Sequence, residues 1–196
     1  MPAAEITQLV LHERQGRDRG WWDQQAACFW PDSVVTLSWF TGSGPDFVAR
    51  SREMSGRGDV SVHRLSPPAV HVAGDRGWAE VPAAIEVRTV LDGVLADLVS
   101  YTRVSYRVER RDGRWGIVGL DAIYERDTLT AVLPGTALPA PDVARFRRSY
   151  AFLAWYLDRR GYPLTDGLPG DDRPEQRDEF YAETLKWLHS GRRTTR

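Results

Sequence analysis

The sequence predicts an α+β fold, in which a curved antiparallel sheet wraps around helices and a C-terminal helical extension follows. Three observations support this prediction. Helical periodicity dominates the first 30 residues, strand-like runs fill residues 60–126, and two further amphipathic stretches follow a proline-rich linker. We therefore expect one domain over residues 1–133 and a helical extension over residues 134–196.

Three short helices and one strand are predicted before residue 60. Apolar residues recur at helical spacing in the first two helices, whereas the strand is a β-branched and aromatic run. A Gly-Ser-Gly-Pro turn then leads into a third helix, which a glycine stop signal ends. In chain order these elements cover residues 3–15, 20–30 and 33–40 and a segment that ends near residue 55.

Four strand-like runs come next and predict an antiparallel meander. The pairs Gly74-Asp75, Asp92-Gly93 and Asp112-Gly113 separate the runs, and such pairs are typical of tight hairpins. Pro67-Pro68 and Pro82 cannot donate ladder hydrogen bonds, so we expect bulges or a sheet edge there, and a bend that leaves a conical cavity. The runs cover residues 60–73, 78–91, 96–110 and 115–126.

Alternation within the strands separates an inner face from an outer one. The even positions of residues 96–108 are apolar, small or weakly polar, and the odd positions of residues 78–91 are mostly apolar. We take these as the inner faces, which brings the hydroxyls of Ser100, Thr102 and Tyr106 into an apolar interior, as a ligand pocket requires.

Composition argues against several classes of function. The chain has 26 Lys and Arg against 27 Asp and Glu, so its charge gives no reason to expect nucleic-acid or anionic-membrane partners. No apolar run approaches the roughly 20 residues that cross a bilayer, and the N-terminus lacks a signal-peptide pattern. The lone Cys28 predicts an inert buried thiol in a reducing compartment. We therefore expect a cytoplasmic protein.

The order of several short motifs is similar to that of a known family. These motifs are R-D-R-G-W-W-D at 17–23, F-W-P-D at 29–32, V-H-R-L-S-P-P-A-V-H-V-A-G-D at 62–75 and D-G-R-W-G-I-V at 112–118. Over roughly residues 1–130 the chain resembles the SnoaL-like branch of the NTF2-like superfamily, and within it the scytalone-dehydratase-like pattern most of all. The resemblance implies a cone-shaped fold, a homodimer or homotrimer formed through the sheet, and a small hydrophobic, polyketide-like ligand.

Asp18 and His63 match the two catalytic positions that this resemblance implies. His63 would take a proton α to a carbonyl, and Asp18 would fix its tautomer, in a lyase or isomerase that needs no cofactor. In an apolar cone we expect desolvation to raise the pKa of Asp18 and the charge of Asp18 to raise the pKa of His63.

Five further residues are predicted to bind the ligand: Thr102, Tyr106, Trp22, Trp39 and Val104. Thr102 falls on the strand where the family places a small hydroxylic pocket residue, and Tyr106 is a donor for a developing enolate. The chain also departs from the family pattern, because the strand over residues 78–91 lacks a second histidine and Arg17 replaces the tyrosine before the aspartate. These departures leave room for isomerisation, cyclisation or simple binding.

Other interpretations of the same residues stay open. Asp18 also suits the N-cap of a helix that starts near residue 20, and His63 also suits a non-catalytic ligand-binding or scaffold protein. The histidines and the cysteine show no ligand spacing, so no metal site is predicted. Two C-terminal helices, expected over residues 142–160 and 175–190, have apolar faces that need a partner: the core, a second subunit or the pocket mouth.

Overall fold

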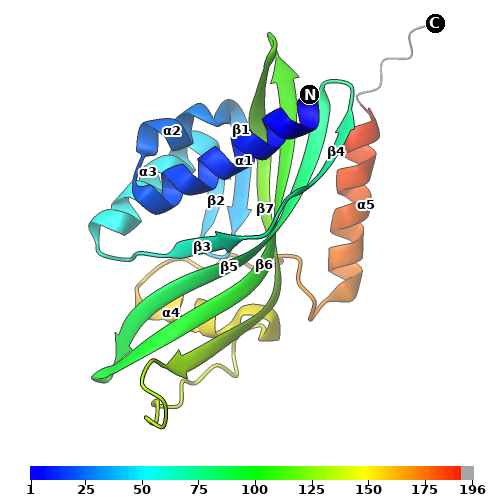
Figure 1. The fold of residues 1–196 in the computed structure, drawn as a ribbon. Coiled ribbons are helices and arrows are strands. Elements are labelled where there is room, and N and C mark those ends of the chain that lie inside the picture. Colours follow the sequence, from blue (N-terminus) through cyan, green and yellow to red (C-terminus); the bar gives the residue numbers. More distant parts are fainter. Residues whose placement is uncertain (191–196) are drawn as a thin grey trace, which may run out of the picture.

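The computed structural model describes residues 1–190, and it shows one strongly curved sheet with helices on both faces (Figure 1). The predicted α+β class with a C-terminal helix is confirmed; the last six residues of the expected extension lie outside the described part. The elements are α1 (Pro2–Arg19), α2 (Trp22–Ala27), β1 (Phe29–Leu37), β2 (Phe40–Ser43), α3 (Gly44–Gly56), β3 (Val62–Leu65), β4 (Ala69–Ala73), β5 (Arg76–Leu91), β6 (Val94–Arg111), β7 (Arg114–Ala131), a 3-10 turn (Arg148–Tyr150), α4 (Ala151–Arg159) and α5 (Pro174–Ser190).

The sheet runs in the order β2-β1-β7-β6-β5-β3, and β4 pairs with β5 beyond the end of β3. Tight turns at Asp92-Gly93 and Asp112-Gly113 join the three long antiparallel strands, and all four residues have positive φ. The predicted hairpins are therefore confirmed. Strand β1 pairs with β7 in parallel, which the all-antiparallel prediction missed. A parallel neighbour is possible because a long stretch of chain separates the two strands.

The prolines divide one predicted strand and leave another continuous. Residues 66–68 separate β3 from β4, so the run over 60–73 forms two strands. Pro82 lies opposite that gap, where its carbonyl accepts a hydrogen bond from the Ser66 N–H at 2.8 Å, and the β5–β6 register is unbroken. Of the two alternatives expected at Pro82, a bulge or a sheet edge, the bulge is wrong: the missing N–H faces the gap between β3 and β4, where no ladder bond is lost. The register shifts lie between β6 and β7 instead.

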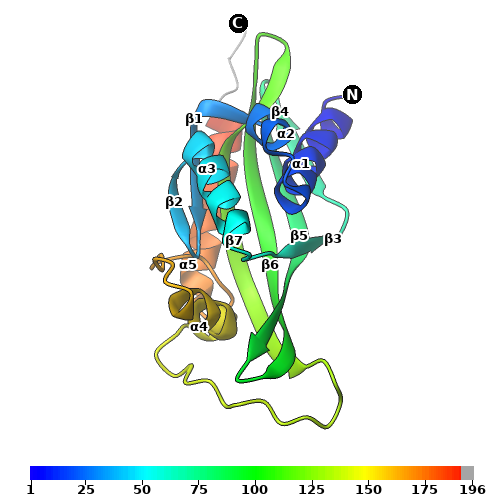
Figure 2. The same cartoon turned by 90° about the vertical axis from the view of Figure 1, so that its left-hand side faces the viewer.

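Figures 1 and 2 show α1, α2, α3 and α4 on one side of the sheet and α5 on the other. Ile6 and Val10 of α1 are completely buried in the main core. The inner faces predicted for β5 and β6 are confirmed, because the even positions of residues 96–108 are all buried. The concave side of the sheet therefore holds the core, and the convex side receives α5.

Two helices are shorter than predicted. The segment over residues 20–30 contributes only α2, because the chain is already extended at Phe29 and runs through Pro31 as part of β1. The segment over 142–160 contributes a 3-10 turn and α4 alone. Asp127 at the end of β7 accepts a hydrogen bond from the Leu153 N–H at 2.8 Å, which satisfies one of the free N–H groups in the first turn of α4.

Candidate active site

A cavity lies on the concave side of the sheet, enclosed by α1, α3, β3 and α4. It measures about 70 Å³, counted as the space open to the centre of a water molecule. That is room for several waters, or for a small organic molecule in their place. Most of its lining is apolar, with contributions from Trp39, Phe47, Val104 and Leu157, and a few polar side chains converge in it, as in ligand sites generally.

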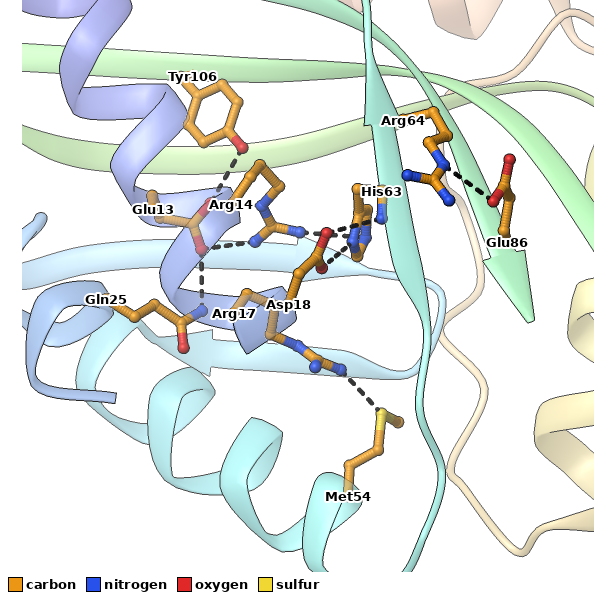
Figure 3. A network of polar contacts seen from close by, with 10 residues as sticks. All are labelled: Glu13, Arg14, Arg17, Asp18, Gln25, Met54, His63, Arg64, Glu86 and Tyr106. Carbon is orange, nitrogen blue, oxygen red and sulfur yellow. Dashed lines mark hydrogen bonds and ion pairs between the residues drawn. The ribbon is translucent and has the colours of Figure 1, made fainter. Parts of the chain in front are cut away.

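His63 lines this cavity, and Asp18, which lies outside the lining, contacts its imidazole (Figure 3). The Oδ1 atom of Asp18 lies 2.6 Å from Nδ1 of His63, and its Oδ2 atom accepts a hydrogen bond from the His63 backbone N–H at 2.8 Å. Both side chains are largely buried, with 11% of Asp18 and 7% of His63 exposed. A carboxylate on Nδ1 places the ring proton there, so the lone pair of Nε2 remains available as an acceptor.

The same geometry excludes the cap interpretation of Asp18. The residue lies within the last turn of α1, and the N-cap of α2 is Trp21, which makes no side-chain cap hydrogen bond. Because α1 continues to Arg19, the carboxylate of Asp18 projects from its side toward β3 instead of opening the next helix.

Arg14 contacts the second ring nitrogen of His63, the one that Asp18 leaves free. Its Nη1 atom lies 3.3 Å from Nε2 of His63, while its Nε and Nη2 atoms each donate to the carboxylate of Glu13 at 2.5 Å. Glu13 is completely buried and also accepts hydrogen bonds from Gln25 at 2.9 Å and from the Tyr106 hydroxyl at 3.0 Å. This network fixes the guanidinium of Arg14 against the imidazole.

The expected upward shifts of both pKa values are wrong. Burial lowers the pKa of His63, and the charges of Arg14 and Arg17 add to that effect, so together they outweigh Asp18, which raises it. Burial raises the pKa of Asp18, but the hydrogen bonds and charge of His63, with the charge of Arg14, outweigh burial and hold it below its ordinary value. The pair at neutral pH is therefore a carboxylate beside a neutral imidazole.

The five predicted binding residues divide into two groups. Trp39 and Val104 line the cavity. Tyr106, Thr102 and Trp22 lie outside that lining, so the cavity does not support their assignment as ligand contacts, which stays a prediction. The Tyr106 hydroxyl is occupied by Glu13, Thr102 is only 1% exposed with no hydrogen-bond partner for its hydroxyl among the described residues, and Trp22 packs partly buried against the core.

The C-terminal extension supplies the far wall of the cavity. Leu153, Tyr156 and Leu157 of α4 line it, together with Tyr162. Asp59, which precedes β3, accepts hydrogen bonds from Arg160 and, at 2.6 Å, from the Tyr162 hydroxyl. This contact ties the end of α4 to the segment that carries His63.

Sequence reasoning missed Arg14 and Asp59 as cavity residues and gave Arg17 no role. Arg14, Arg17 and Asp18 stand at positions i, i+3 and i+4 of one helix, so their spacing places them on one face. That spacing could have indicated that the two arginines lie beside Asp18, but nothing in the local sequence of Asp59 indicates its partners.

Within residues 1–190, no group of three or more potential metal ligands occurs. No helix in the same range has the length and apolar character that crossing a bilayer requires.

The fold is similar to those of several solved structures at low sequence identity. A hexachlorocyclohexane dehydrochlorinase, LinA type 2, is 18% identical with a TM-score of 0.53, over 71% of this chain and 94% of its own. A putative scytalone dehydratase from Novosphingobium aromaticivorans is 19% identical with a TM-score of 0.52, over 74% and 94%. A protein of unknown function from Mycobacterium tuberculosis is 15% identical with a TM-score of 0.56, over 82% and 96%. These likenesses show the NTF2-like fold.

No curated protein sequence matches the chain. The profile of one family does, and it covers residues 3–121, which include α1, β3 and the whole of β6. With the fold and the profile in agreement, the chain belongs to the SnoaL-like domain family.

Proposed function

We propose that this protein is a cofactor-free lyase or isomerase that abstracts a proton next to a carbonyl group in a small hydrophobic, polyketide-like compound. The observation that carries the proposal is the Asp18–His63 pair: the two side chains meet at 2.6 Å, and His63 lines a mostly apolar cavity. A neutral imidazole oriented by a carboxylate is a suitable general base near neutral pH. We also propose a homodimer or homotrimer, as the family resemblance implies, and a location in the cytoplasm.

The chemistry follows from the positions of the charges. Nε2 of His63 takes the α-proton, and the electron pair of the broken C–H bond forms an enolate. Arg14, whose guanidinium lies beside Nε2, stabilises the developing negative charge. In a lyase, the enolate then expels a β-hydroxyl, which leaves as water with the proton from His63. In an isomerase, His63 returns the proton to another carbon.

A non-catalytic ligand-binding protein is the second candidate, and one contact favours it. Arg14 Nη1 already lies 3.3 Å from Nε2 of His63, so the lone pair needed for proton abstraction is engaged when no ligand is bound. For catalysis, a substrate has to take over the Arg14 N–H group. The two candidates therefore differ in whether a bound carbonyl compound loses its α-proton.

Exchange of α-protons for deuterium in D₂O tests this difference without knowledge of the full reaction. A panel of β-hydroxy ketones, β-hydroxy acids and β,γ-unsaturated ketones is incubated with the protein, and NMR follows the loss of the α-proton signal. Catalysed exchange with at least one compound is expected, and His63→Ala should reduce its rate by about 10²- to 10⁴-fold, the usual contribution of a general base.

His71→Ala is the matched control, because His71 is an exposed histidine on β4 that stacks on Trp78, outside the cavity lining. It should leave the exchange rate unchanged. Asp18→Asn should slow exchange, because an amide cannot stabilise the imidazolium that forms. No exchange with any compound would favour the binding protein, and catalysed exchange that persists unchanged in His63→Ala would contradict the role of His63 as the base.

A further inference from the structure

Arg17 is a buried cation in the cavity wall. The residue is 6% exposed and lines the cavity together with His63. Among residues 1–190 its guanidinium makes one hydrogen bond, in which Nη2 donates to the sulfur of Met54 at 3.2 Å, and no carboxylate lies within 4.0 Å of its nitrogens. A thioether sulfur is a weak acceptor, so most of the donor capacity of this guanidinium is unused.

The acidic groups nearby already serve other partners. Glu13 holds Arg14, Asp18 holds His63, and Asp59 accepts from Arg160 and Tyr162. Figure 3 shows the first two of these contacts and the Arg17 side chain directed toward Met54 on α3, away from both acids. The cavity wall therefore carries two guanidinium groups from one face of α1, and within residues 1–190 only that of Arg14 is paired with a carboxylate.

Buried charges in proteins are normally paired, because removing an ion from water without a counter-ion is costly. For Arg17, burial and the neighbouring charge of Arg14 disfavour the charged form and lower the pKa to about 10. A ligand that brings an anionic group into the cavity would supply the missing partner. Guanidinium matches a carboxylate especially well, because two parallel N–H groups meet two oxygens.

We propose that Arg17 binds a carboxylate of the ligand, so that the natural substrates of this site are small organic acids with an apolar body. The inference rests on the proposed function in that it assigns a substrate class to the same cavity. His63 lies on that cavity as well, so an acid held by Arg17 presents its apolar part and its reacting carbon to the imidazole and to Trp39 and Val104.

Benzoate and benzamide form a matched pair of probes, since they share size and shape and differ in charge. Isothermal titration calorimetry at pH 7 should show benzoate binding to the wild-type protein at least about tenfold more tightly than benzamide. Arg17→Met should abolish this preference, and Arg17→Lys should retain part of it because the charge remains. Arg50→Met, at an exposed arginine of α3 that pairs with Glu53, should retain it fully.

Thermal unfolding provides a second measurement on the same variants. Arg17→Met removes an uncompensated buried charge, so its melting temperature should equal or exceed that of the wild type in the absence of ligand. The inference is overturned if the wild-type protein fails to prefer benzoate, including the case in which neither probe binds. It is equally overturned if Arg17→Met keeps the preference.

The results separate this inference from the proposed function. Benzoate preference that depends on Arg17, without α-proton exchange in any compound, supports an acid-binding site and contradicts catalysis. Exchange that depends on His63 but occurs only in neutral ketones, without benzoate preference, supports catalysis and overturns the role of Arg17. His63→Ala should keep the benzoate preference, because the imidazole is not the group that pairs with the carboxylate.

Discussion

Helices α4 and α5 both lie in the C-terminal extension, yet they meet opposite faces of the sheet. Helix α4 packs on the concave face, where Leu153, Tyr156 and Leu157 complete the cavity. Helix α5 packs on the convex face, where Leu188 joins Trp78 and Ala73 in a small separate cluster. One extension therefore does two things: its first helix shapes the site, and its second covers apolar surface that the sheet exposes.

The contacts of the two helices differ in kind as well as in place. Polar groups hold both ends of α4, since Asp127 accepts from its first turn and Asp59 binds Arg160 just after its last residue. Helix α5 has an apolar contact with the sheet, which Arg76 supplements by donating to the Trp187 carbonyl at 2.8 Å. The position of α4 depends on groups beside the cavity, and that of α5 does not.

Leu153→Ala and Leu188→Ala should have the largest effects on stability and sharpen the comparison. Both leucines are buried, at 5% and 1% exposed, so each substitution should lower the free energy of unfolding by about 2–5 kcal/mol in urea titrations. Only Leu153→Ala enlarges the cavity, so it alone should change the affinity for benzoate. An equal change in Leu188→Ala would contradict the division of roles between α4 and α5.

Asp127→Ala should have an intermediate effect. The variant loses the acceptor for the Leu153 N–H, and loss of a cap typically costs about 1 kcal/mol. Asp158→Ala is the control on the same helix, because Asp158 forms an exposed ion pair with Arg145 and should change stability by less than about 0.5 kcal/mol. Urea titrations of both variants measure the difference, and equal losses would show that the Asp127 contact does not hold α4.

The pH dependence of deuterium exchange should show the smallest effect. Because the pKa of His63 is lowered, the acid limb of the exchange rate should lie below pH 6.5. Arg17→Met should move this limb slightly upward, since it removes one of the charges that lower the pKa. A limb at or above pH 6.5 in the wild type, or a downward move in the variant, would contradict the assigned charge environment.

Stability should follow the same titration. The unfolded chain binds more protons than the folded one between the lowered pKa of His63 and its ordinary value of 6.5, so stability falls as pH falls through that window. Asp18 also makes the fold less stable as the pH falls, although its charged form is an anion and that of His63 a cation. Its lowered pKa stabilises the fold above about pH 3.8, and that contribution is lost on further acidification. Urea titrations across this pH range measure both.

Part of the candidate site could be predicted because it depends on local pattern. The hairpins at Asp92-Gly93 and Asp112-Gly113 and the inner faces of β5 and β6 follow from turn chemistry and alternation, and the structure confirms them. The predicted helix over residues 142–160 is too long, because an amphipathic pattern does not show that Asp127, distant in sequence, accepts from the Leu153 N–H in the first turn of a helix that begins at Ala151.

The sequence by itself determined the fold class, the order of the central strands and the positions of Asp18 and His63 within a family motif, because these depend on periodicity, turns and short spacings. Only the tertiary structure decided which groups surround the imidazole. Arg14, Arg17, Asp59 and α4 come together through contacts between distant segments. Burial and the charges of the two arginines lower the pKa of His63, whereas the contacts of His63 and the charge of Arg14 lower that of Asp18, so both shifts are opposite to those expected from the sequence. The energy of a buried charge depends on every neighbour in space, and a single sequence does not show those neighbours.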